Sequence, residues 1–402
     1  MTAALDIFLN DEKAGVLTLL PDGRILFSFN VSYASDSNRP VLSQSYFSAD
    51  GQLLTPTKTY TGKAPPFFSN MLPEGQLRTY LAERGGIKPT HEFHLLRLLG
   101  EDLPGAVIAK PVEGFSLLLK KEEEALLKKK ETEQPLRFSL AGVQLKFSAL
   151  MARDGGLTIP VTGMGGGWIV KLPSPAHDNV PENEYAMMHM AGEIGIPVPE
   201  IKLVPLSSIA GLPDFGKLRG TQALAVKRFD RAEDGTRIHI EDFAQVYSLF
   251  SEKKYEGVSF TNIAGMIWTL TGEPGLRDFI RRLAYTILTG NGDMHLKNWS
   301  FIYRDGRTPA MAPAYDMVST VPYIPNDKLA LKFLNTKDMK QCDERLFEKL
   351  AEKAGLPKRL VSEVVRETAE KTREAWTKNK PHYALPADID KMIDDHMNAI
   401  PL

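Results

Sequence analysis

The sequence predicts an α+β protein in which a strand-rich amino-terminal portion is followed by a helical carboxyl-terminal portion. Short apolar runs separated by turn residues alternate in residues 5–33, which indicates antiparallel strands. Residues 138–230 contain further short β-like runs, and beyond Ile240 the apolar spacing becomes helical. Of the 402 residues, 43% are hydrophobic and the formal net charge is −1, so the composition excludes disorder for most of the chain.

The amino-terminal strands are expected to form a small meander, with turns at the Asn-Asp pair 10–11 and the Asp-Gly pair 22–23. Residues 67–86 then change to a helical period that ends at two glycines. Residues 91–100 continue the helical pattern, and GAVIAKP at 105–111 is typical of one more strand. This part of the chain is therefore expected to pair a small sheet with helices.

A run of mostly charged and polar residues, KKEEEALLKKKETEQ at 120–134, divides the chain. It indicates an exposed helix or a linker, and its interleaved glutamates favour a solvated connector over a nucleic-acid patch. Four parts are expected: an amino-terminal subdomain (1–115), a charged linker (116–135), a strand-rich lobe (136–235) and a helical lobe (236–402).

Composition also limits location and partners. Cys342 is the single cysteine, which excludes a disulfide scaffold and fits a reducing compartment. No apolar run approaches the roughly 20 residues that span a bilayer, and no basic residue precedes Lys13, so neither membrane insertion nor secretion is expected. We therefore expect a cytoplasmic protein. A sequence pI near 6.7 offers no global basic field, so any DNA contact is expected to be local or made through a partner.

The strongest chemical signal is GNGDMHLKNWS at residues 290–300, which follows an apolar helical stretch. Asp293 and Asn298 have the spacing used for phosphoryl transfer to a hydroxyl, in which Asp accepts the substrate proton and Asn binds Mg²⁺. Lys297 would offset charge on the transferred phosphoryl group. On spacing alone, a surface turn rich in Gly, Asn and Asp is an equal alternative.

A second acidic residue, Asp316, lies 18 positions after Asn298 in PAYDMVS. An Asp in this place suits the Mg²⁺ that bridges the β- and γ-phosphates of ATP, and a buried turn is the alternative. Because removal of a carboxylate relieves like-charge repulsion in an unloaded metal site, we expect Asp316→Ala to leave stability unchanged or higher.

Lys171 lies within the apolar run WIVKLP, where a lysine needs a charged partner. Glu184, in the first turn of the helix expected near Asn183, would bridge it as the strand-lysine and helix-glutamate pair of kinases does, and Glu182 is the competitor. Solvation of Lys171 on an edge strand is the alternative.

Two further segments would complete a nucleotide site. FSLAGVQLKFSA at 138–149 has an Ala-Gly turn between apolar runs, which is a weak phosphate-loop signal that an ordinary hairpin also explains. In ALAVKRFDR, residues Lys227, Arg228 and Phe229 stand where a strand meets the helical half, the place of the hinge that reads adenine in a two-lobed kinase. The combined pattern predicts a two-lobed, protein-kinase-like α+β fold.

These motifs together resemble the HipA toxin kinases of bacterial toxin–antitoxin pairs, over essentially the whole chain. FFSNMLPEG (67–75) and GEDLPGAV (100–107) resemble amino-terminal signatures of that family. FSLAGVQLK, WIVKLP, AVKRFDR, GDMHLKN and YDMVS resemble, in order, its phosphate loop, lysine strand, hinge, catalytic loop and metal-binding aspartate. The resemblance implies a protein serine kinase with an extra amino-terminal subdomain that depends on ATP and Mg²⁺.

The resemblance implies the same roles for the catalytic-loop, metal and lysine-strand residues given above. The residues implied to line ATP are Ala141, Gly142, Val143, Gln144, Leu145, Lys146, Lys171, Lys227, Arg228, Phe229, His295, Leu296, Lys297, Asn298, Tyr315 and Asp316. Ser139 matches the family's autophosphorylated serine, whose modification expels the loop and silences the enzyme. Lys227 and Leu145 stand where the family often has Glu.

Partners are also implied by the resemblance. They are a small HipB-like helix-turn-helix antitoxin, operator DNA reached through that antitoxin, and a protein substrate such as an aminoacyl-tRNA synthetase, whose phosphorylation stalls growth. Two other classes stay open: a small-molecule kinase of the aminoglycoside-phosphotransferase type, and a catalytically silent scaffold. The former usually has His two residues before the catalytic Asp, where this chain has Asn291.

Overall fold

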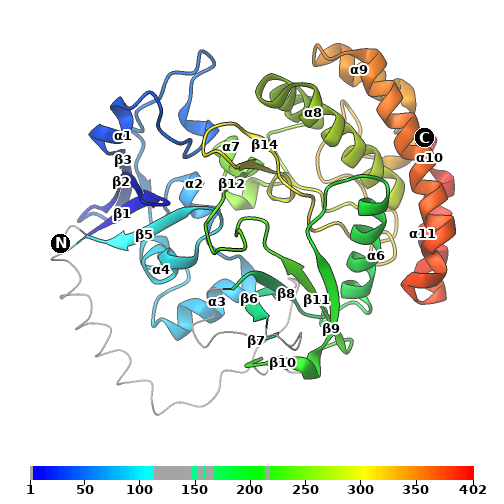
Figure 1. Cartoon of the computed structure of the whole chain (residues 1–402), viewed down its shortest axis with the longest axis horizontal. Coiled ribbons are helices and arrows are strands. Elements are labelled where there is room, and N and C mark those ends of the chain that lie inside the picture. The colour runs from blue at the N-terminus through cyan, green and yellow to red at the C-terminus, as the bar shows by residue number, and fades with distance from the viewer. Residues whose placement is uncertain (1–2, 113–145, 152–156, 159–165, 213–217) are drawn as a thin grey trace.

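The structure is a computed structural model of the chain (Figure 1). It describes residues 3–112, 146–151, 157–158, 166–212 and 218–402. In Figure 1 the amino-terminal sheet lies on the left, a second sheet lies below the centre, and the long helices lie towards the upper right. The predicted two-lobed α+β class is confirmed. The charged linker and the boundaries expected around it lie outside the described residues.

The amino-terminal part is built on a five-stranded sheet. Its order is β4-β3-β2-β1-β5, and its strands are β1 (Ala3–Leu9), β2 (Glu12–Leu19), β3 (Arg24–Phe29), β4 (Tyr60–Thr61) and β5 (Val107–Pro111). The first three strands pair in sequence and antiparallel, which confirms the predicted meander. Asn10 and Gly23 both have positive φ, 53° and 82°, as the connecting turns require.

Short helices accompany this sheet in the amino-terminal part: α1 (Val31–Ser35), α2 (Pro66–Ser69), α3 (Gly75–Arg84) and α4 (Glu92–Leu99). The single helical stretch predicted over 67–86 is wrong, because α2 ends at Ser69 and α3 begins only at Gly75. Pro73 cannot donate a helical hydrogen bond, and Gly75 has a φ of 56°. The break leaves residues 70–74 in an extended turn, close to the helical lobe.

The second sheet has six strands in the order β10-β7-β6-β8-β11-β9. They are β6 (Lys146–Met151), β7 (Leu157–Thr158), β8 (Trp168–Lys171), β9 (Ile201–Pro205), β10 (Ile209–Ala210) and β11 (Gln222–Lys227), with α6 (Val180–Glu193) packed beside β9 and β11. Lys171 pairs in register with Leu224 on one side and Lys146 on the other. The strand that carries Lys171 is therefore internal, and the edge-strand alternative is wrong.

The helical lobe contains α7 (Phe243–Val246), α8 (Phe260–Thr289), α9 (Glu344–Lys353), α10 (Lys358–Tyr383) and α11 (Ala387–Ala399). A small sheet of β12 (His239–Asp242), β13 (Ser300–Tyr303) and β14 (Ala310–Met311) lies beside them. Helix α8 is kinked where Gly272 has a φ of 64°. In the part of the chain that the structure describes, no helix combines the length and the apolar character needed to cross a membrane.

One-turn 3₁₀ segments connect the larger elements. They are η1 (Gln44–Tyr46), η2 (Gly100–Asp102), η3 (Leu206–Ser208), η4 (Ser251–Lys253), η5 (Leu296–Asn298) and η6 (Met339–Gln341). Of these, η4 and η5 frame the candidate site.

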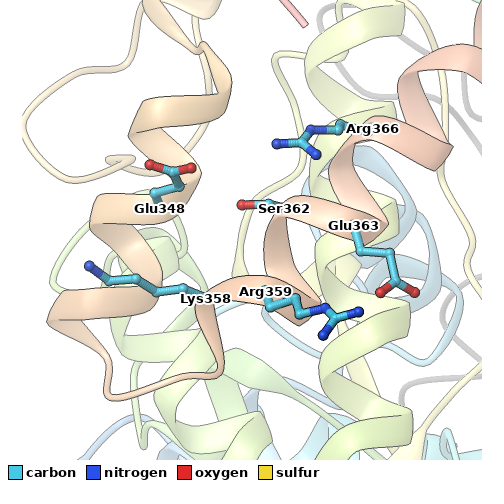
Figure 2. Close-up of a pocket in the computed structure, with 6 residues that line it drawn as sticks. All are labelled: Glu348, Lys358, Arg359, Ser362, Glu363 and Arg366. Atoms are coloured by element: carbon cyan, nitrogen blue, oxygen red, sulfur yellow. The ribbon is translucent and has the colours of Figure 1, made fainter.

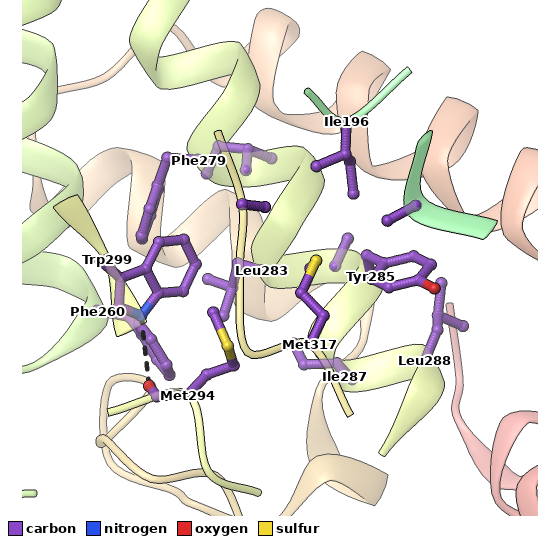
Figure 3. Packing of buried hydrophobic residues seen from close by; sticks show 14 of the residues in the cluster. Ile196, Phe260, Phe279, Leu283, Tyr285, Ile287, Leu288, Met294, Trp299 and Met317 are labelled. Carbon is purple, nitrogen blue, oxygen red and sulfur yellow. Dashed lines mark hydrogen bonds between the residues drawn. The ribbon is translucent and has the colours of Figure 1, made fainter. Parts of the chain in front are cut away.

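A buried aromatic cluster anchors the loop that follows α8 (Figure 3). The ring of Trp299 lies 5.1 Å from that of Phe279 and 6.2 Å from that of Phe260, measured between centroids. Its indole Nε1 donates to the carbonyl of Met294 at 3.3 Å, and Met294 and Leu296 are themselves buried. The apolar side chains of the loop are thus anchored in the core of the helical lobe.

The amino-terminal part is joined to the helical lobe by buried polar contacts. Glu241 of β12 accepts hydrogen bonds from Ser43 Oγ at 2.6 Å and from the backbone N–H of Gln44 at 3.0 Å, and it also accepts from Tyr303. Gln245 of α7 donates to the carbonyl of Phe67 at 2.9 Å. These contacts set the orientation of the amino-terminal part on the helical lobe.

We expect Glu241→Gln to weaken the dependence of stability on pH. Burial raises the pKa of Glu241 from 4.5 to about 7, although the hydrogen bond from Ser43 acts against it. Between these values the folded state binds more protons than the unfolded state, so the free energy of unfolding falls as the pH rises. Thermal melts at about pH 5 and about pH 8 should show a smaller loss of stability in the variant than in the wild type. Equal losses in both proteins would contradict the buried-acid interpretation.

Candidate active site

The loop that carries Asp293 is held by its own backbone and side chains. Helix α8 ends at Thr289, and Gly290 caps it with a left-handed φ of 68°, as is common just beyond a helix. The N–H of Asp293 donates to Asn291 Oδ1 at 2.9 Å, and Asn298 Nδ2 donates to the carbonyl of Asp293 at 2.9 Å. The structure therefore brings Asp293 and Asn298 together, and the amide oxygen of Asn298 stays available to a ligand.

The carboxylate of Asp293 has a partner that the sequence did not indicate. Tyr255 Oη donates to Asp293 Oδ1 at 2.5 Å, and the Tyr255 ring meets the ring of His295 edge-on at 5.0 Å between centroids. Burial raises the pKa of Asp293, although the hydrogen bond from Tyr255 acts to lower it. A carboxylate with a raised pKa is better suited to accept a proton during catalysis.

His295 lies beside Asp293 and is neutral at neutral pH. Burial, with a smaller effect from nearby Lys254, lowers the pKa of His295 to about 4. Its Nδ1 is buried and has no hydrogen-bond partner among the described residues. Leu296, the next residue, has a side chain with no exposed surface that packs in the core, so Leu296 cannot line a nucleotide with its side chain.

Lys171, Glu184 and Asp316 meet although they come from β8, α6 and the segment after β14. The ammonium of Lys171 pairs with both carboxylates, so Glu184, and not its competitor Glu182, is the helical partner. The side chain of Lys171 is only 7% exposed. Burial alone would lower the pKa of Lys171, but Asp316 and Glu184 outweigh it and raise the pKa above its usual value.

Asp316 is fixed and charged. Burial would raise the pKa of Asp316, but Lys171 outweighs it, with help from Lys146, and holds the pKa far below its usual range. Its φ of 53° is left-handed, which costs a non-glycine residue about 1–3 kcal/mol and is common at functional sites. The charge of Asp316 adds a smaller effect to the burial that raises the pKa of Asp293.

The oxygen donors at this point fit a divalent cation. Asp316 presents an ionised carboxylate, and Asn298 presents an amide oxygen, because its Nδ2 is already used. Oxygen ligands of this kind, completed by phosphate and water oxygens, suit Mg²⁺. When bound between these residues, Mg²⁺ would neutralise charge on the nucleotide phosphates.

Lys297, in the same loop, is held by the amino-terminal part. Its Nζ lies 2.6 Å from Glu74 Oε1 and donates to the carbonyl of Asn70 at 3.1 Å. Both of these partners belong to the turn between α2 and α3 in the amino-terminal part. Tyr315 is bonded to the same loop, since its hydroxyl donates to the carbonyl of Lys297 at 2.9 Å.

The three predicted hinge residues have different surroundings. The N–H of Lys227 donates to the carbonyl of Glu200 and that of Arg228 to the carbonyl of Gly167, both at 2.8 Å, so neither N–H is free to read adenine. The guanidinium of Arg228 is buried against Asp230. Phe229 is half-buried, and its ring lies 5.7 Å from that of Tyr315.

The predicted phosphate loop contributes a single described residue. Lys146 is the exposed first residue of β6, opposite Lys171. Ala141, Gly142, Val143, Gln144, Leu145 and the proposed autophosphorylation site Ser139 lie outside the described residues. Their roles stay predictions.

Three residues around the loop were missed by sequence reasoning: Tyr255, Lys254 and Glu74. Lys254 Nζ lies 3.0 Å from Glu74 Oε2. Tyr255 follows Lys254 directly, and Glu74 stands in the FFSNMLPEG motif. That motif was the available signal for Glu74, whereas no sequence pattern marked the other two.

A separate surface groove lies between α9 and α10, remote from these residues in sequence. Figure 2 shows its lining of charged side chains and one serine, with Glu348 on α9 and Lys358, Arg359 and Ser362 on α10. Because opposite charges line it together and no catalytic-loop residue reaches it, this groove is not part of the candidate site.

Comparison with known proteins matches both parts of the chain to family models. The model described as the HipA N-terminal domain matches residues 5–110, and the model described as the HipA-like C-terminal domain matches residues 138–376. Y4dM of Sinorhizobium fredii, named as a candidate kinase, is 48% identical over 402 residues, which are 99% of this chain and 97% of the relative. The serine/threonine-protein kinase toxin HipA of Shewanella oneidensis is 26% identical, over 80% of this chain and 76% of the relative.

A solved structure agrees with the fold. HipA of Shewanella oneidensis, in a complex with HipB and its operator DNA, superposes with a TM-score of 0.72 at 22% identity. The match covers 99% of this chain and 96% of that chain. At this level of identity, the likeness establishes a shared fold.

Proposed function

Because the chain belongs to the HipA family of kinases, we propose that it is an ATP-dependent protein serine/threonine kinase and the toxin of a HipBA-like toxin–antitoxin pair. The observation that carries this proposal is the meeting of Lys171, Glu184 and Asp316 next to the loop of Asp293 and Asn298. In phosphoryl transfer the protein contributes positioned charges rather than covalent bonds to the substrate. This arrangement supplies such charges.

Each residue has a separate part in the proposed reaction. Asp293 orients the substrate hydroxyl and accepts its proton, while Tyr255 holds the carboxylate in place. Lys171, kept in its position by Glu184, binds the phosphates of ATP. Lys297 stabilises the negative charge on the phosphoryl group as it passes from the leaving oxygen of ATP to the hydroxyl oxygen of the substrate.

The test is incubation of the purified protein with labelled ATP, Mg²⁺ and a cell lysate. A labelled protein band supports a protein kinase. A labelled small molecule supports the aminoglycoside-phosphotransferase alternative, and no transfer supports a silent scaffold. Mass spectrometry of the labelled band would name the substrate, which we propose is a translation-related protein such as an aminoacyl-tRNA synthetase, whose phosphorylation causes growth arrest or persistence.

The proposed partner is a HipB-like helix-turn-helix antitoxin that brings the kinase to operator DNA. The support is the Shewanella oneidensis complex of HipA, HipB and operator DNA, which shares this fold. Co-purification with the product of a neighbouring helix-turn-helix gene, followed by a DNA mobility shift with and without the kinase, tests it. A shift that the kinase alone produces would contradict indirect DNA contact.

Ser139 is the proposed site of autophosphorylation, and we expect Ser139→Ala to remove the phosphopeptide found after incubation with ATP. A phosphate adds a charge of about −1.5 to −2, which repels ATP's own phosphates, so Ser139→Asp should weaken ATP binding. Mass spectrometry and nucleotide titration measure both effects. Phosphate on another residue, with none on Ser139, would overturn the assignment.

A further inference from the structure

The turn between α2 and α3 reaches into the catalytic loop. Asn70 Nδ2 donates to the carbonyl of Leu249 at 2.7 Å, and its own carbonyl accepts from Lys297 at 3.1 Å. At the end of this turn, the carboxylate of Glu74 lies between two ammonium groups, 2.6 Å from Lys297 Nζ and 3.0 Å from Lys254 Nζ. A residue of the amino-terminal part thus contacts Lys297, in the loop of Asp293, and Lys254, the neighbour of Tyr255.

The geometry of Glu74 points to a role other than capping α3. Glu74 is the N-cap of that helix, yet its side chain makes no capping hydrogen bond. Ser, Thr, Asp and Asn are the favoured N-cap residues. The longer side chain of Glu instead carries its carboxylate to the two lysines.

The charges of this cluster suit a phosphoryl group. Two lysines and one carboxylate leave a net positive charge, and the side chains of Lys297, Lys254 and Glu74 are 14%, 20% and 32% exposed. Burial would raise the pKa of Glu74, but Lys297 and Lys254 outweigh it and lower the pKa to about 2. Glu74 is therefore ionised at any pH at which the protein would work.

We propose that Glu74 is a positioning residue of the active site, which holds the ammonium groups of Lys297 and Lys254 beside the transferred phosphoryl group. The amino-terminal part then completes the catalytic site of the helical lobe. Without Glu74, both lysines would regain rotamer freedom and Lys297 would lose its fixed place in the loop. This inference rests on the proposed kinase function.

The test is Glu74→Gln, which keeps the size of the side chain and removes its charge. We expect kcat to fall by about ten- to a hundredfold, with a smaller change in the KM for ATP. A misplaced charge reduces the stabilisation of the transition state more than it weakens nucleotide binding. Glu74→Asp keeps the charge on a shorter side chain and should recover part of the loss. If Glu74 had a purely structural role, Glu74→Gln would not lower kcat more than it changes KM, and Glu74→Asp would not recover part of the loss.

The matched control is Glu252→Gln. Glu252 pairs with Lys63 across the same junction, on exposed side chains, so this variant removes one carboxylate from the junction without touching the lysines beside Asp293. We expect wild-type kcat and KM for Glu252→Gln. Wild-type kinetics in Glu74→Gln, or a rise in kcat, would overturn the proposal, and the rise would identify Glu74 as an inhibitory contact.

A second measurement does not depend on activity. Amine-reactive labelling followed by mass spectrometry compares the reactivity of Lys297 and Lys254 in the wild type and in Glu74→Gln. Loss of the carboxylate releases both amines from their ion pairs, so both should react severalfold faster, whereas Lys63 should not. Unchanged rates would contradict the positioning role. If the wild type transfers no phosphate at all, the kinase function fails, while labelling still decides whether Glu74 holds the lysines.

Discussion

Asp293→Asn is expected to abolish phosphoryl transfer and leave the fold intact. The amide keeps the shape of the side chain, and its oxygen can still accept the hydrogen bond from Tyr255. The bond from Asn298 reaches the backbone carbonyl of residue 293 and is unaffected. An amide cannot accept the substrate proton, and loss of general-base catalysis costs about 10²–10⁴-fold in rate.

The measurement is transfer of labelled phosphate in parallel with thermal melting. Asp305→Asn is the control, because Asp305 is an exposed turn residue that accepts from the N–H groups of Arg307 and Thr308 in the β13–β14 hairpin, and we expect it to keep wild-type transfer. The raised pKa of Asp293 also predicts that wild-type activity falls on the acid side as this carboxylate becomes protonated. Full activity in Asp293→Asn would remove Asp293 from the role of base.

Local patterns were sufficient to predict most of the elements. The meander of β1 to β3 follows from alternating apolar residues and from turns that tolerate positive φ at Asn10 and Gly23. The apolar positions before Gly290 likewise predict the packed second half of α8. The prediction of one helix over 67–86 was wrong because it followed the apolar spacing and gave too little weight to Pro73 and Gly75. These two residues separate α2 from α3.

Parts of the candidate site were predictable where the chain itself brings residues together or where a motif has a known role. Asp293 and Asn298 lie on one loop, and Glu184 follows from the need to neutralise a lysine in an apolar strand. Contacts between distant segments carry no such local pattern. Tyr255 lies 38 positions from Asp293, and Glu74 lies 180 positions from Lys254.

The structure also changes the expected effect of Asp316→Ala on stability. The sequence placed Asp316 among acidic groups, so its removal was expected to leave stability unchanged or to raise it. Instead, its carboxylate pairs with the buried ammonium of Lys171, which holds the pKa of Asp316 far below its usual range. A group with a lowered pKa in the folded state stabilises the fold while it is ionised.

We therefore expect Asp316→Ala to lower the free energy of unfolding by about 1–3 kcal/mol. The loss should be smaller than if Lys171 were left without any charged partner, because Lys171 still pairs with Glu184. The stability that Asp316 contributes is fully present above the pKa of the unfolded aspartate and is lost as the pH falls through its lowered folded value. Denaturant unfolding at neutral pH measures this loss, and an equal or higher stability in the variant would restore the sequence-based expectation.

The same variant should also lose activity, and its magnesium dependence identifies the cause. Glu184→Gln is the comparison, because it too removes a carboxylate from Lys171 but leaves Asp316 in place. If Asp316 is a ligand of Mg²⁺, Glu184→Gln should lower transfer with an unchanged magnesium requirement, whereas Asp316→Ala should need far more Mg²⁺ for any residual transfer. If both variants keep the wild-type magnesium requirement, Asp316 acts only through Lys171, and the metal role assigned to it is wrong.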